Sequence, residues 1–361
     1  MRNRRNTIER LPRFDRAGFL CLGALRELFV IASVVGCVLA LVWQSSFMFS
    51  LHSKSERESN EVAAPVKGLI IDRDNTSLIA LSWPGELKSI NLESGVASHV
   101  RIPKDFVSAV SSSRNSTTVM LSEWSENYEL HNRVDIVCHH ELVLSEEVVF
   151  YPATSANVFV SSDGQIAVLS NADGHVIGWD LSGTKPFRWE FQIGRKSHRC
   201  NLSPDGRRLF IAPAEGNLFV CDARTGTNCL ELGEAVIDCR AVEWSDDGRQ
   251  LAVSDEKGGV YVFEADSGQR TWFQQHADFS FVRSLTFSND GSLLATGGFD
   301  HTIRIWDLSL PADPPLCLTG QKGVIRALQF TPADRTLISG SLDGTIYEWS
   351  LASGQTVRRL Q

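Results

Sequence analysis

One segment recurs through this sequence every 42 to 43 residues, and this period constrains the fold more than any other feature. The third residue of a short turn marks each copy: Asp163 in "SSDGQIAVLS", Asp205 in "SPDGRRLFIA", Asp247 in "SDDGRQLAVS", Asp290 in "SNDGSLLATG" and Ala333 in "TPADRTLISG". Two earlier segments, around Asp74 and Arg114, keep the apolar pattern but lack Asp-Gly. The chain therefore holds seven repeat units between residues 66 and 361.

The pattern within a unit predicts four short strands. In the unit around Asp290, "VRSLTFS" alternates apolar and polar residues, "NDG" turns the chain and "SLLATGG" returns it. The β-branched stretch "HTIRIWD" supplies a third strand, and a fourth follows it. Such a unit has two apolar faces and cannot bury either face alone. We therefore expect seven units to stack and close a ring around one shared core.

Three segments resemble the blades of WD-repeat β-propellers: "GGFDHTIRIWD" (297–307), "GSLDGTIYEWS" (340–350) and "ADGHVIGWD" (172–180). The resemblance implies an all-β, seven-bladed β-propeller of four-stranded antiparallel blades over residues 66–361. Blade 4 has Cys221-Asp222 and blade 5 has Phe263-Glu264 in place of Trp-Asp, but an apolar residue still fills the buried position. In blades 1 and 2 the strands are predicted from spacing alone.

The resemblance also implies a buried polar network in the best-kept blades. In blade 6 its members are His276, Thr296, Asp300 and Trp306. In blade 7 they are Ser339, Asp343 and Trp349, with Gln321 where the family has histidine. The implied role of these residues is to make each blade rigid, because loss of one member leaves buried partners without a hydrogen bond.

Ring closure is the next expectation. Members of the family often complete the last blade with an N-terminal strand, but the segment before residue 66 is polar here. Residues 356–361, "TVRRLQ", supply an outer strand for blade 7 themselves. We predict closure by packing of blade 7 on blade 1.

Residues 28–51 predict a transmembrane helix, because "LFVIASVVGCVLALVW" has no charge and apolar residues resume after Gln44-Ser45-Ser46. A helix of this length spans about 36 Å, against a hydrocarbon core of about 30 Å. Residues 1–27 form a basic leader, which the positive-inside rule places in the cytoplasm. Residues 52–65 are a polar tether. The predicted protein is single-pass, with an extracytoplasmic propeller. A cleaved signal or a lipoprotein site near Cys37 is the alternative.

Composition narrows the possible functions. The formal net charge is -8, and the residues after position 54 carry 27 bases against 40 acids. An acidic body repels phosphate backbones, so we expect no nucleic-acid binding. No nucleophile elbow, phosphate loop or dinucleotide motif is present, and we expect no catalysis and no cofactor. "CHHE" (138–141) splits its side chains between two strand faces, so we expect no metal site.

The cysteines of the repeat region are expected mainly to fill core positions. Cys200, Cys221 and Cys239 align with core hydrophobes of other blades, a common role for free cysteine. We expect at most one disulfide, and the sequence does not select a pair.

Arg240, Arg283 and Arg326 occupy one repeat position at the start of three successive blades, and His198 holds it in blade 4. First strands line the channel of a propeller, so these side chains are expected to gather near one mouth. The favoured interpretation is that each arginine pairs with an acid such as Asp255, Asp300 or Asp343. The competing hypothesis is a cationic patch that docks an acidic segment of another protein.

These observations together predict a non-catalytic protein–protein interaction scaffold, presented on a membrane by a WD-repeat propeller. Rigid rings with variable loops suit binding, although fold alone does not name a ligand. The alternative is an extracytoplasmic enzyme or small-molecule-binding propeller that uses the channel mouth.

Overall fold

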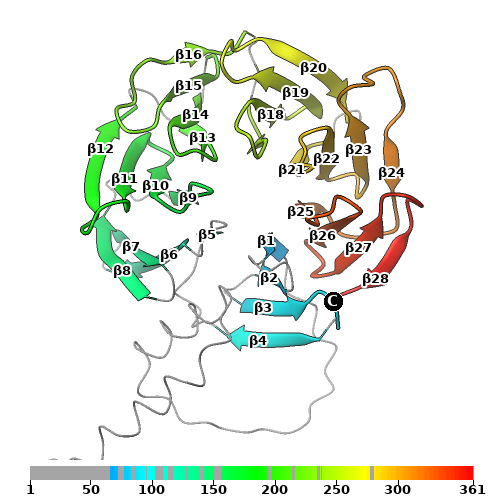
Figure 1. The fold of residues 1–361 in the computed structure, drawn as a ribbon, viewed down its shortest axis with the longest axis horizontal. Helices are drawn as coiled ribbons and strands as arrows, with labels where there is room; N and C mark the ends of the chain where they lie inside the picture. Colours follow the sequence, from blue (N-terminus) through cyan, green and yellow to red (C-terminus); the bar gives the residue numbers. More distant parts are fainter. Residues whose placement is uncertain are drawn as a thin grey trace, which may run out of the picture. The chain divides into compact units, whose positions relative to one another are not determined.

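The computed structural model describes residues 66–71, 77–82, 86–94, 96–101, 109–112, 117–126, 129–138, 141–149, 156–193, 197–213, 216–233, 236, 238–276 and 280–360. These residues form seven four-stranded antiparallel sheets with no α-helix. In each sheet the strands pair in chain order, and Figure 1 shows the sheets arranged as blades around a common axis. The all-β propeller with seven blades is therefore confirmed.

The blades follow one another along the chain, and the first strand of each is innermost (Figure 1). Blade 1 consists of β1 (Val66–Ile71), β2 (Ser77–Ser82), β3 (Glu86–Asn91) and β4 (Ala97–Arg101). Blade 2 consists of β5 (Ala109–Ser112), β6 (Thr117–Glu126), β7 (Glu129–Cys138) and β8 (Glu141–Val149). Blade 3 consists of β9 (Ala156–Val160), β10 (Ile166–Asn171), β11 (His175–Asp180) and β12 (Phe187–Gln192).

The remaining blades have the same order. Blade 4 consists of β13 (Ser197–Leu202), β14 (Arg208–Pro213), β15 (Phe219–Asp222) and β16 (Leu230–Glu231). Blade 5 consists of β17 (Ala241–Trp244), β18 (Gln250–Ser254), β19 (Gly259–Glu264) and β20 (Arg270–Gln275). Blade 6 consists of β21 (Val282–Phe287), β22 (Leu293–Gly298), β23 (Ile303–Asp307) and β24 (Leu316–Leu318). Blade 7 consists of β25 (Ile325–Phe330), β26 (Thr336–Ser341), β27 (Ile346–Ser350) and β28 (Thr356–Arg359).

The repeated aspartate holds the turn between the first and second strands. In blade 4 the Ser203 hydroxyl donates to Asp205 at 2.5 Å, and the Arg207 amide donates to the same oxygen at 3.1 Å. Gly206 follows at φ +70°, where a Cβ would also lie 2.7 Å from Ile166 of blade 3. Blades 3, 5 and 6 repeat the serine–aspartate bond. These aspartates are therefore structural, and they fix the turn that sets the repeat.

The core lies between neighbouring blades rather than within them. Each of six buried apolar clusters combines residues of two adjacent blades, one for every pair from blade 2 to blade 7 and one for blades 7 and 1. Trp179, Phe210, Phe263 and Trp349 are among the largest fully buried side chains. Phe263 fills the position of the repeat tryptophan in blade 5, as predicted.

Blade 7 closes the ring with its own four strands, and β28 is the outer one. Val66 and Leu69 of β1 pack with Ala327 and Ile338 of blade 7. Closure by packing of blade 7 on blade 1 is therefore confirmed for the strands that the structure describes. Residues 52–65 lie outside them.

One arginine adds polar contacts to this closure. The Arg358 guanidinium pairs with Glu348 of its own blade at 2.7 Å and donates to the backbone carbonyls of Leu92 and Glu93 in blade 1. It thus joins the last blade to the first.

No helix within the described ranges is long and apolar enough to cross a membrane. Residues 28–51, for which the sequence predicts a membrane helix, lie outside those ranges, as do residues 1–27.

The contacts of Arg358 predict that its loss weakens ring closure. Arg358→Gln is expected to lower the free energy of unfolding by about 1–3 kcal/mol, because Glu348 and two carbonyls lose a charged donor. The measurement is chemical denaturation of the full-length chain followed by tryptophan fluorescence. Arg249→Gln is the control, since the Arg249 side chain is 81% exposed and lies 3.9 Å from Asp247. Equal stability of the two variants would contradict a closing role for Arg358.

Candidate functional site

The candidate site begins with an irregularity in the first strands. In blades 1, 4, 6 and 7 the pairing of the first and second strands skips one residue. The skipped residues are Lys67, His198, Arg283 and Arg326. A bulged residue leaves the ladder, and its side chain is aimed in a new direction. The repeat position that the sequence singles out is therefore a β-bulge, occupied by a basic residue in all four blades.

Lys67 was missed by the sequence reasoning, although the signal was present. It precedes Asp74 by seven residues, the same spacing that separates Arg283 from Asp290. The side chains of Lys67 and His198 lie outside the described part of the chain. The predicted contribution of His198 to partner binding therefore stays a prediction.

Four arginines from successive blades line one pocket of about 290 Å³ among the innermost strands. We call Arg199, Arg240, Arg283 and Arg326 the arginine cluster. Arg199 was also missed, because it lies one residue beyond the repeat position. Its Nε donates to the carbonyl of Arg240 at 3.3 Å, which links blades 4 and 5 at the pocket wall. The structure thus brings together the three arginines that the sequence selected and adds a fourth.

The cluster is crowded with positive charge. Burial lowers the pKa of Arg283 to about 10, and repulsion by Arg326, Arg199 and Arg240 adds to the shift. Burial, followed by Arg199, also lowers the pKa of Arg326. Both guanidiniums stay charged at neutral pH, so the pocket keeps a positive charge that suits an anionic ligand.

The arginines differ in how they are paired. Arg240 lies 2.8 Å from Asp238 and 3.3 Å from Glu256, and its guanidinium stacks 5.1 Å from the centre of the Phe281 ring. Among the described residues, Arg283 and Arg326 have no hydrogen bond or ion pair to their side chains. Pairing is thus the outcome for Arg240 and not for the other two.

The acids proposed as partners for the arginines are engaged elsewhere. Asp255 accepts from the Tyr261 hydroxyl at 2.9 Å. Asp300 pairs with Arg304, and Asp343 accepts from Thr345 at 2.7 Å. The expectation that these three acids neutralise the arginines is therefore wrong. The physical reason is that each carboxylate serves its own second turn.

One carboxyl group also lines the pocket. Burial raises the pKa of Glu243 to about 8, and Asp246 raises it further. Glu243 is therefore largely uncharged at neutral pH and does not cancel the positive charge of the cluster.

In blade 6 four residues form a continuous polar chain. The Trp306 indole donates to the Thr296 hydroxyl at 2.9 Å, Thr296 lies 2.7 Å from His276 Nδ1, and His276 Nε2 lies 3.1 Å from Asp300. Burial lowers the pKa of His276 despite its bond to Asp300. A neutral imidazole protonated at Nε2 satisfies these three bonds, and the Arg304 guanidinium, which also lies 2.8 Å from Nε2, then donates to Asp300 instead.

Asp300 is the charged end of this chain. Burial opposes its ionisation, but hydrogen bonds from His276 and Arg304 outweigh burial and hold the pKa of Asp300 well below its usual range. The network joins the second turn to the core and leaves no group facing the channel pocket. Its role in the described structure is structural.

Blade 7 builds the same connection with different residues. The Trp349 indole donates to Ser339 at 2.8 Å, and Ser339 donates to Gln321 at 2.7 Å. Gln321 donates to Thr345 at 3.0 Å, and Thr345 donates to Asp343. Gln321 thus replaces the histidine, and Thr345 carries the connection to Asp343.

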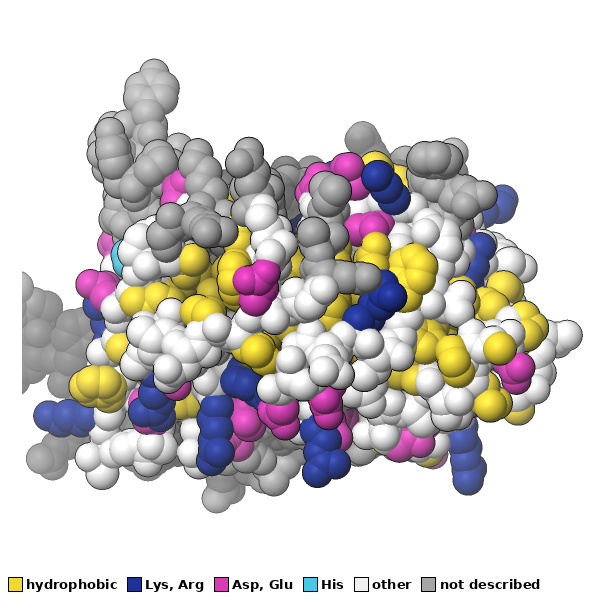
Figure 2. Space-filling model, turned by 90° about the horizontal axis from the view of Figure 1, so that it is seen from above, with side chains coloured by type: hydrophobic (Ala, Val, Ile, Leu, Met, Phe, Trp, Pro, Cys, Tyr) yellow, Lys and Arg dark blue, Asp and Glu magenta, His cyan; other side chains and the backbone are white. Residues whose placement is uncertain are grey.

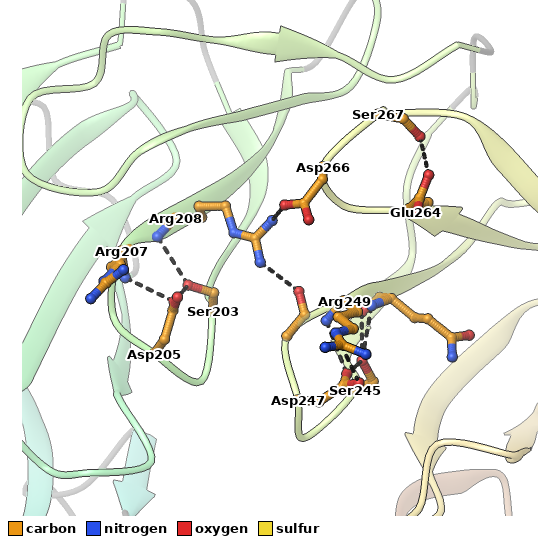
Figure 3. A network of polar contacts seen from close by, with 12 residues as sticks. Ser203, Asp205, Arg207, Arg208, Ser245, Asp247, Arg249, Glu264, Asp266 and Ser267 are labelled. Carbon is orange, nitrogen blue, oxygen red and sulfur yellow. Dashed lines mark hydrogen bonds and ion pairs between the residues drawn. The ribbon is translucent and has the colours of Figure 1, made fainter.

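The opposite ends of the first strands carry a second polar network, shown in Figure 3. Arg208 of blade 4 pairs with Asp266 of blade 5 at 2.8 Å and donates to the carbonyl of Gly248 at 2.6 Å. Its guanidinium also lies 5.3 Å from the centre of the Trp244 ring. The Arg208 guanidinium thus has a carboxylate, a carbonyl and an aromatic ring as neighbours. Arg208 joins two blades and, unlike Arg283, has its charge matched by a carboxylate.

Charges of both signs are also mixed on the side of the ring that carries β16 and β20. Figure 2 shows Lys and Arg side chains interspersed with Asp and Glu side chains there. The single-sign arginine cluster therefore contrasts with this outer side.

The structure contains a disulfide between Cys221 and Cys229, which bridges β15 and the turn before β16. The expectation that Cys221 is a free core filler is wrong, although it is buried. The exposed Cys229 lies opposite it because the intervening turn folds back on the blade. Cys200 and Cys239 are buried and form no disulfide, as expected, and burial raises the pKa of Cys239 to about 12.

Comparison with known proteins supports the same fold. The family model "WD domain, G-beta repeat" matches residues 268–307 and 313–350, which contain most of blades 6 and 7. The chain therefore folds as a β-propeller, and two of its segments match the WD40 repeat. The β-propeller domain of Cps50 (Swd1) from Myceliophteria thermophila superposes on this propeller with a TM-score of 0.63 at 15% identity, covering 82% of this chain and 100% of that one.

The sequence relatives match this chain over shorter stretches. "U3 snoRNP-associated protein-like EMB2271" of Arabidopsis thaliana is 35% identical over 82 residues, 23% of this chain and 16% of that protein. "Denticleless protein homolog" of Danio rerio is 35% identical over 80 residues, 22% of this chain and 12% of that protein. The chain thus spans less than a fifth of the length of either relative.

The polar network of blade 6 predicts a pH-dependent stability. The folded-state pKa of His276 lies below its usual 6.5, so the unfolded chain binds the proton more tightly and stability falls as the pH falls below 6.5. Asp300, with its lowered pKa, adds a further loss below 3.8. His276→Gln, which copies Gln321 of blade 7, is expected to fold and to flatten the first of these losses. Thermal unfolding from pH 7.5 to pH 5 measures it.

The control for this titration is His301→Asn. His301 is exposed and lies at φ +60°, where asparagine is tolerated. Its melting temperature should follow the pH profile of the unsubstituted chain. An unchanged pH profile in His276→Gln would show that another group carries the dependence.

Proposed function

We propose that this chain is a non-catalytic interaction scaffold whose propeller binds an acidic segment of another protein at the arginine-lined mouth of its channel. The observation that carries the proposal is that Arg283 and Arg326, on the wall of the 290 Å³ pocket, have no partner among the described residues. An unpaired, partly buried cation is costly unless a ligand supplies the counter-charge. A carboxylate meets two or more guanidiniums with charge-assisted, often bidentate hydrogen bonds.

A protein segment is the proposed partner rather than a nucleic acid. The expectation of no nucleic-acid binding is not supported by the comparisons, because one similar protein is by its name associated with the U3 snoRNP. Net charge argues for the protein ligand, since the residues after position 54 carry 27 bases against 40 acids and repel a long phosphate backbone outside the pocket.

We also propose that residues 28–51 anchor the chain in a membrane and that the propeller lies on the extracytoplasmic side. The uncharged run and the arginines before it support this arrangement. The Cys221–Cys229 disulfide supports the same side, because disulfides persist in oxidising compartments and are rare in the cytosol. The propeller would then present its channel mouth to partners outside the cytoplasm.

The ligand proposal predicts selective binding of acidic peptides. The full-length chain in detergent micelles is titrated with fluorescent 12-residue peptides that alternate glutamate, lysine or glutamine with serine. The glutamate peptide should bind, with an affinity that falls with salt. Arg283→Glu with Arg326→Glu should abolish that binding, and Arg207→Glu with Arg249→Glu, at the first turns, should leave it unchanged.

Three outcomes of this titration would overturn the ligand proposal. The first is equal binding of all peptides, and the second is tighter binding of a single-stranded RNA of equal charge at the same salt. The third is displacement of the peptide by micromolar glutarate or phosphate, which would favour the alternative of a small-molecule site.

The membrane proposal predicts two properties of the chain recovered from cells in the presence of an alkylating agent. The chain should stay in the membrane pellet after an alkaline wash, since a transmembrane helix is not released by it. Mass spectrometry should find Cys221 and Cys229 alkylated only after reduction, whereas Cys200 and Cys239 are alkylated on denaturation alone. Release into the wash would contradict the anchor, and alkylation of Cys221 without reduction would contradict the oxidising compartment.

A further inference from the structure

Beside the three arginines of blades 5, 6 and 7 lies a second repeat position, and the residue there determines whether the arginine has an acidic partner. This position lies 16 residues after each arginine, in the turn between the second and third strands. It holds Glu256 in blade 5, Phe299 in blade 6 and Leu342 in blade 7. Glu256 reaches Arg240 at 3.3 Å and neutralises it in part. Phe299 and Leu342 are uncharged, and the arginines of their blades, Arg283 and Arg326, have no ion pair within the described part of the chain.

The backbone places the two apolar residues in the same way. The Phe299 amide donates to the carbonyl of Phe281 at 3.0 Å, and the Leu342 amide donates to the carbonyl of Val324 at 2.9 Å. Phe281 and Val324 each lie close before the bulged arginine of their blade. The apolar side chain of each turn is therefore held beside the start of the strand that carries the arginine.

These apolar side chains are exposed. Phe299 is 43% exposed and Leu342 is 36% exposed, although both are large. Phe299 packs edge-on against Phe281, with ring centres 5.5 Å apart, and Arg240 covers another part of the Phe281 ring. A Cβ on Gly298 would lie 2.0 Å from the carbonyl oxygen of Phe281, so only glycine permits this approach. The aromatic pair is thus fixed at the rim next to the arginine cluster.

We propose that blades 6 and 7 form a mixed docking site for an acidic–apolar peptide, in which Arg283 and Arg326 bind carboxylates and Phe299 and Leu342 contact bulky apolar side chains. This inference rests on the proposed function and specifies the partner, which carries glutamate or aspartate interspersed with leucine or phenylalanine. Charge complementarity selects the acids, because two guanidiniums have no carboxylate partner among the residues that the structure describes. Exposed apolar groups beside them select the large side chains, since burying such groups on binding is favourable.

In blade 5 the arginine at the same repeat position is already paired within the chain. There the turn residue is itself an acid, so Arg240 is occupied from within the chain by Glu256 and Asp238. The contact between Glu256 and Arg240 therefore illustrates how a ligand carboxylate would meet Arg283 or Arg326.

The test compares two peptides of equal charge on the full-length chain in detergent micelles. One alternates glutamate with serine, and the other alternates glutamate with leucine. The leucine peptide is expected to bind at least about tenfold more tightly. Phe299→Ser with Leu342→Ser should remove that advantage and leave the affinity of the serine peptide unchanged.

A second pair of variants tests the role of the turn residue. Phe299→Glu with Leu342→Glu copies blade 5 into blades 6 and 7 and should lower the affinity of both peptides by about tenfold or more, because each arginine gains an internal partner. Glu256→Ser should raise the affinity of both peptides, since it releases one of the two acids on Arg240. Melting temperatures within a few degrees of the unsubstituted chain establish that each variant is folded.

The outcomes separate the inference from the function on which it rests. Equal affinity of the two acidic peptides, or loss of only the serine peptide in Phe299→Ser with Leu342→Ser, overturns the mixed site and leaves an acidic-peptide scaffold. Failure of both acidic peptides to bind the unsubstituted chain overturns the proposed function and the inference together. Unchanged binding in Phe299→Glu with Leu342→Glu overturns the assignment of Arg283 and Arg326 as the carboxylate-binding groups.

Discussion

A propeller blade has two apolar faces, and neither is buried until the blade has a neighbour on each side. This constraint explains why the buried clusters combine residues of adjacent blades and why the last blade must meet the first. It also explains why the polar residues concentrate at the turns, the places where a blade is not covered. In blades 3 to 6 an aspartate turn fixes one end of the inner strand, and in blades 1, 4, 6 and 7 a bulge reshapes the other end.

Within each repeat, some positions are constrained by the geometry that all blades share, and other positions can hold many residue types. The geometry requires an apolar residue at the tryptophan position, which explains why Phe263 and the half-cystine Cys221 are both accepted there. In blades 6 and 7 the outward residue of the turn between the second and third strands, Phe299 or Leu342, is bonded through its backbone amide, so the fold sets no such requirement on its side chain. Binding residues accumulate where the fold leaves side chains unconstrained.

Much of the fold was predictable, because the 42 to 43 residue period is a direct consequence of one blade per repeat. The members of the blade 6 network were also readable, since spacing places Thr296 and Trp306 on neighbouring strands. The partners of the arginines were not. Asp300 was assigned to two roles by the sequence, and only three-dimensional geometry shows that its own histidine and Arg304 use its charge.

Two other features required coordinates. The Cys221–Cys229 disulfide depends on a turn whose course no pattern fixes, so alignment with a buried position was a misleading guide. The bulge that aims Arg283 is invisible in a list of residue types, because a skipped pair in the ladder leaves the alternation of the following residues intact. Sequence reasoning found the repeat position but not the reason that its side chains differ from their neighbours.

The bulged arginine and the turn residue 16 positions later recur in units that are otherwise alike. Each of these units therefore contributes one such pair of positions to the channel mouth, and each pair can change independently of the others. Duplication of a repeat copies both positions, and a single substitution at the turn residue can then pair the arginine or leave it open to a ligand without disturbing the core. A change of ligand in this architecture therefore needs no new loop and no insertion, only substitutions at these two repeat positions.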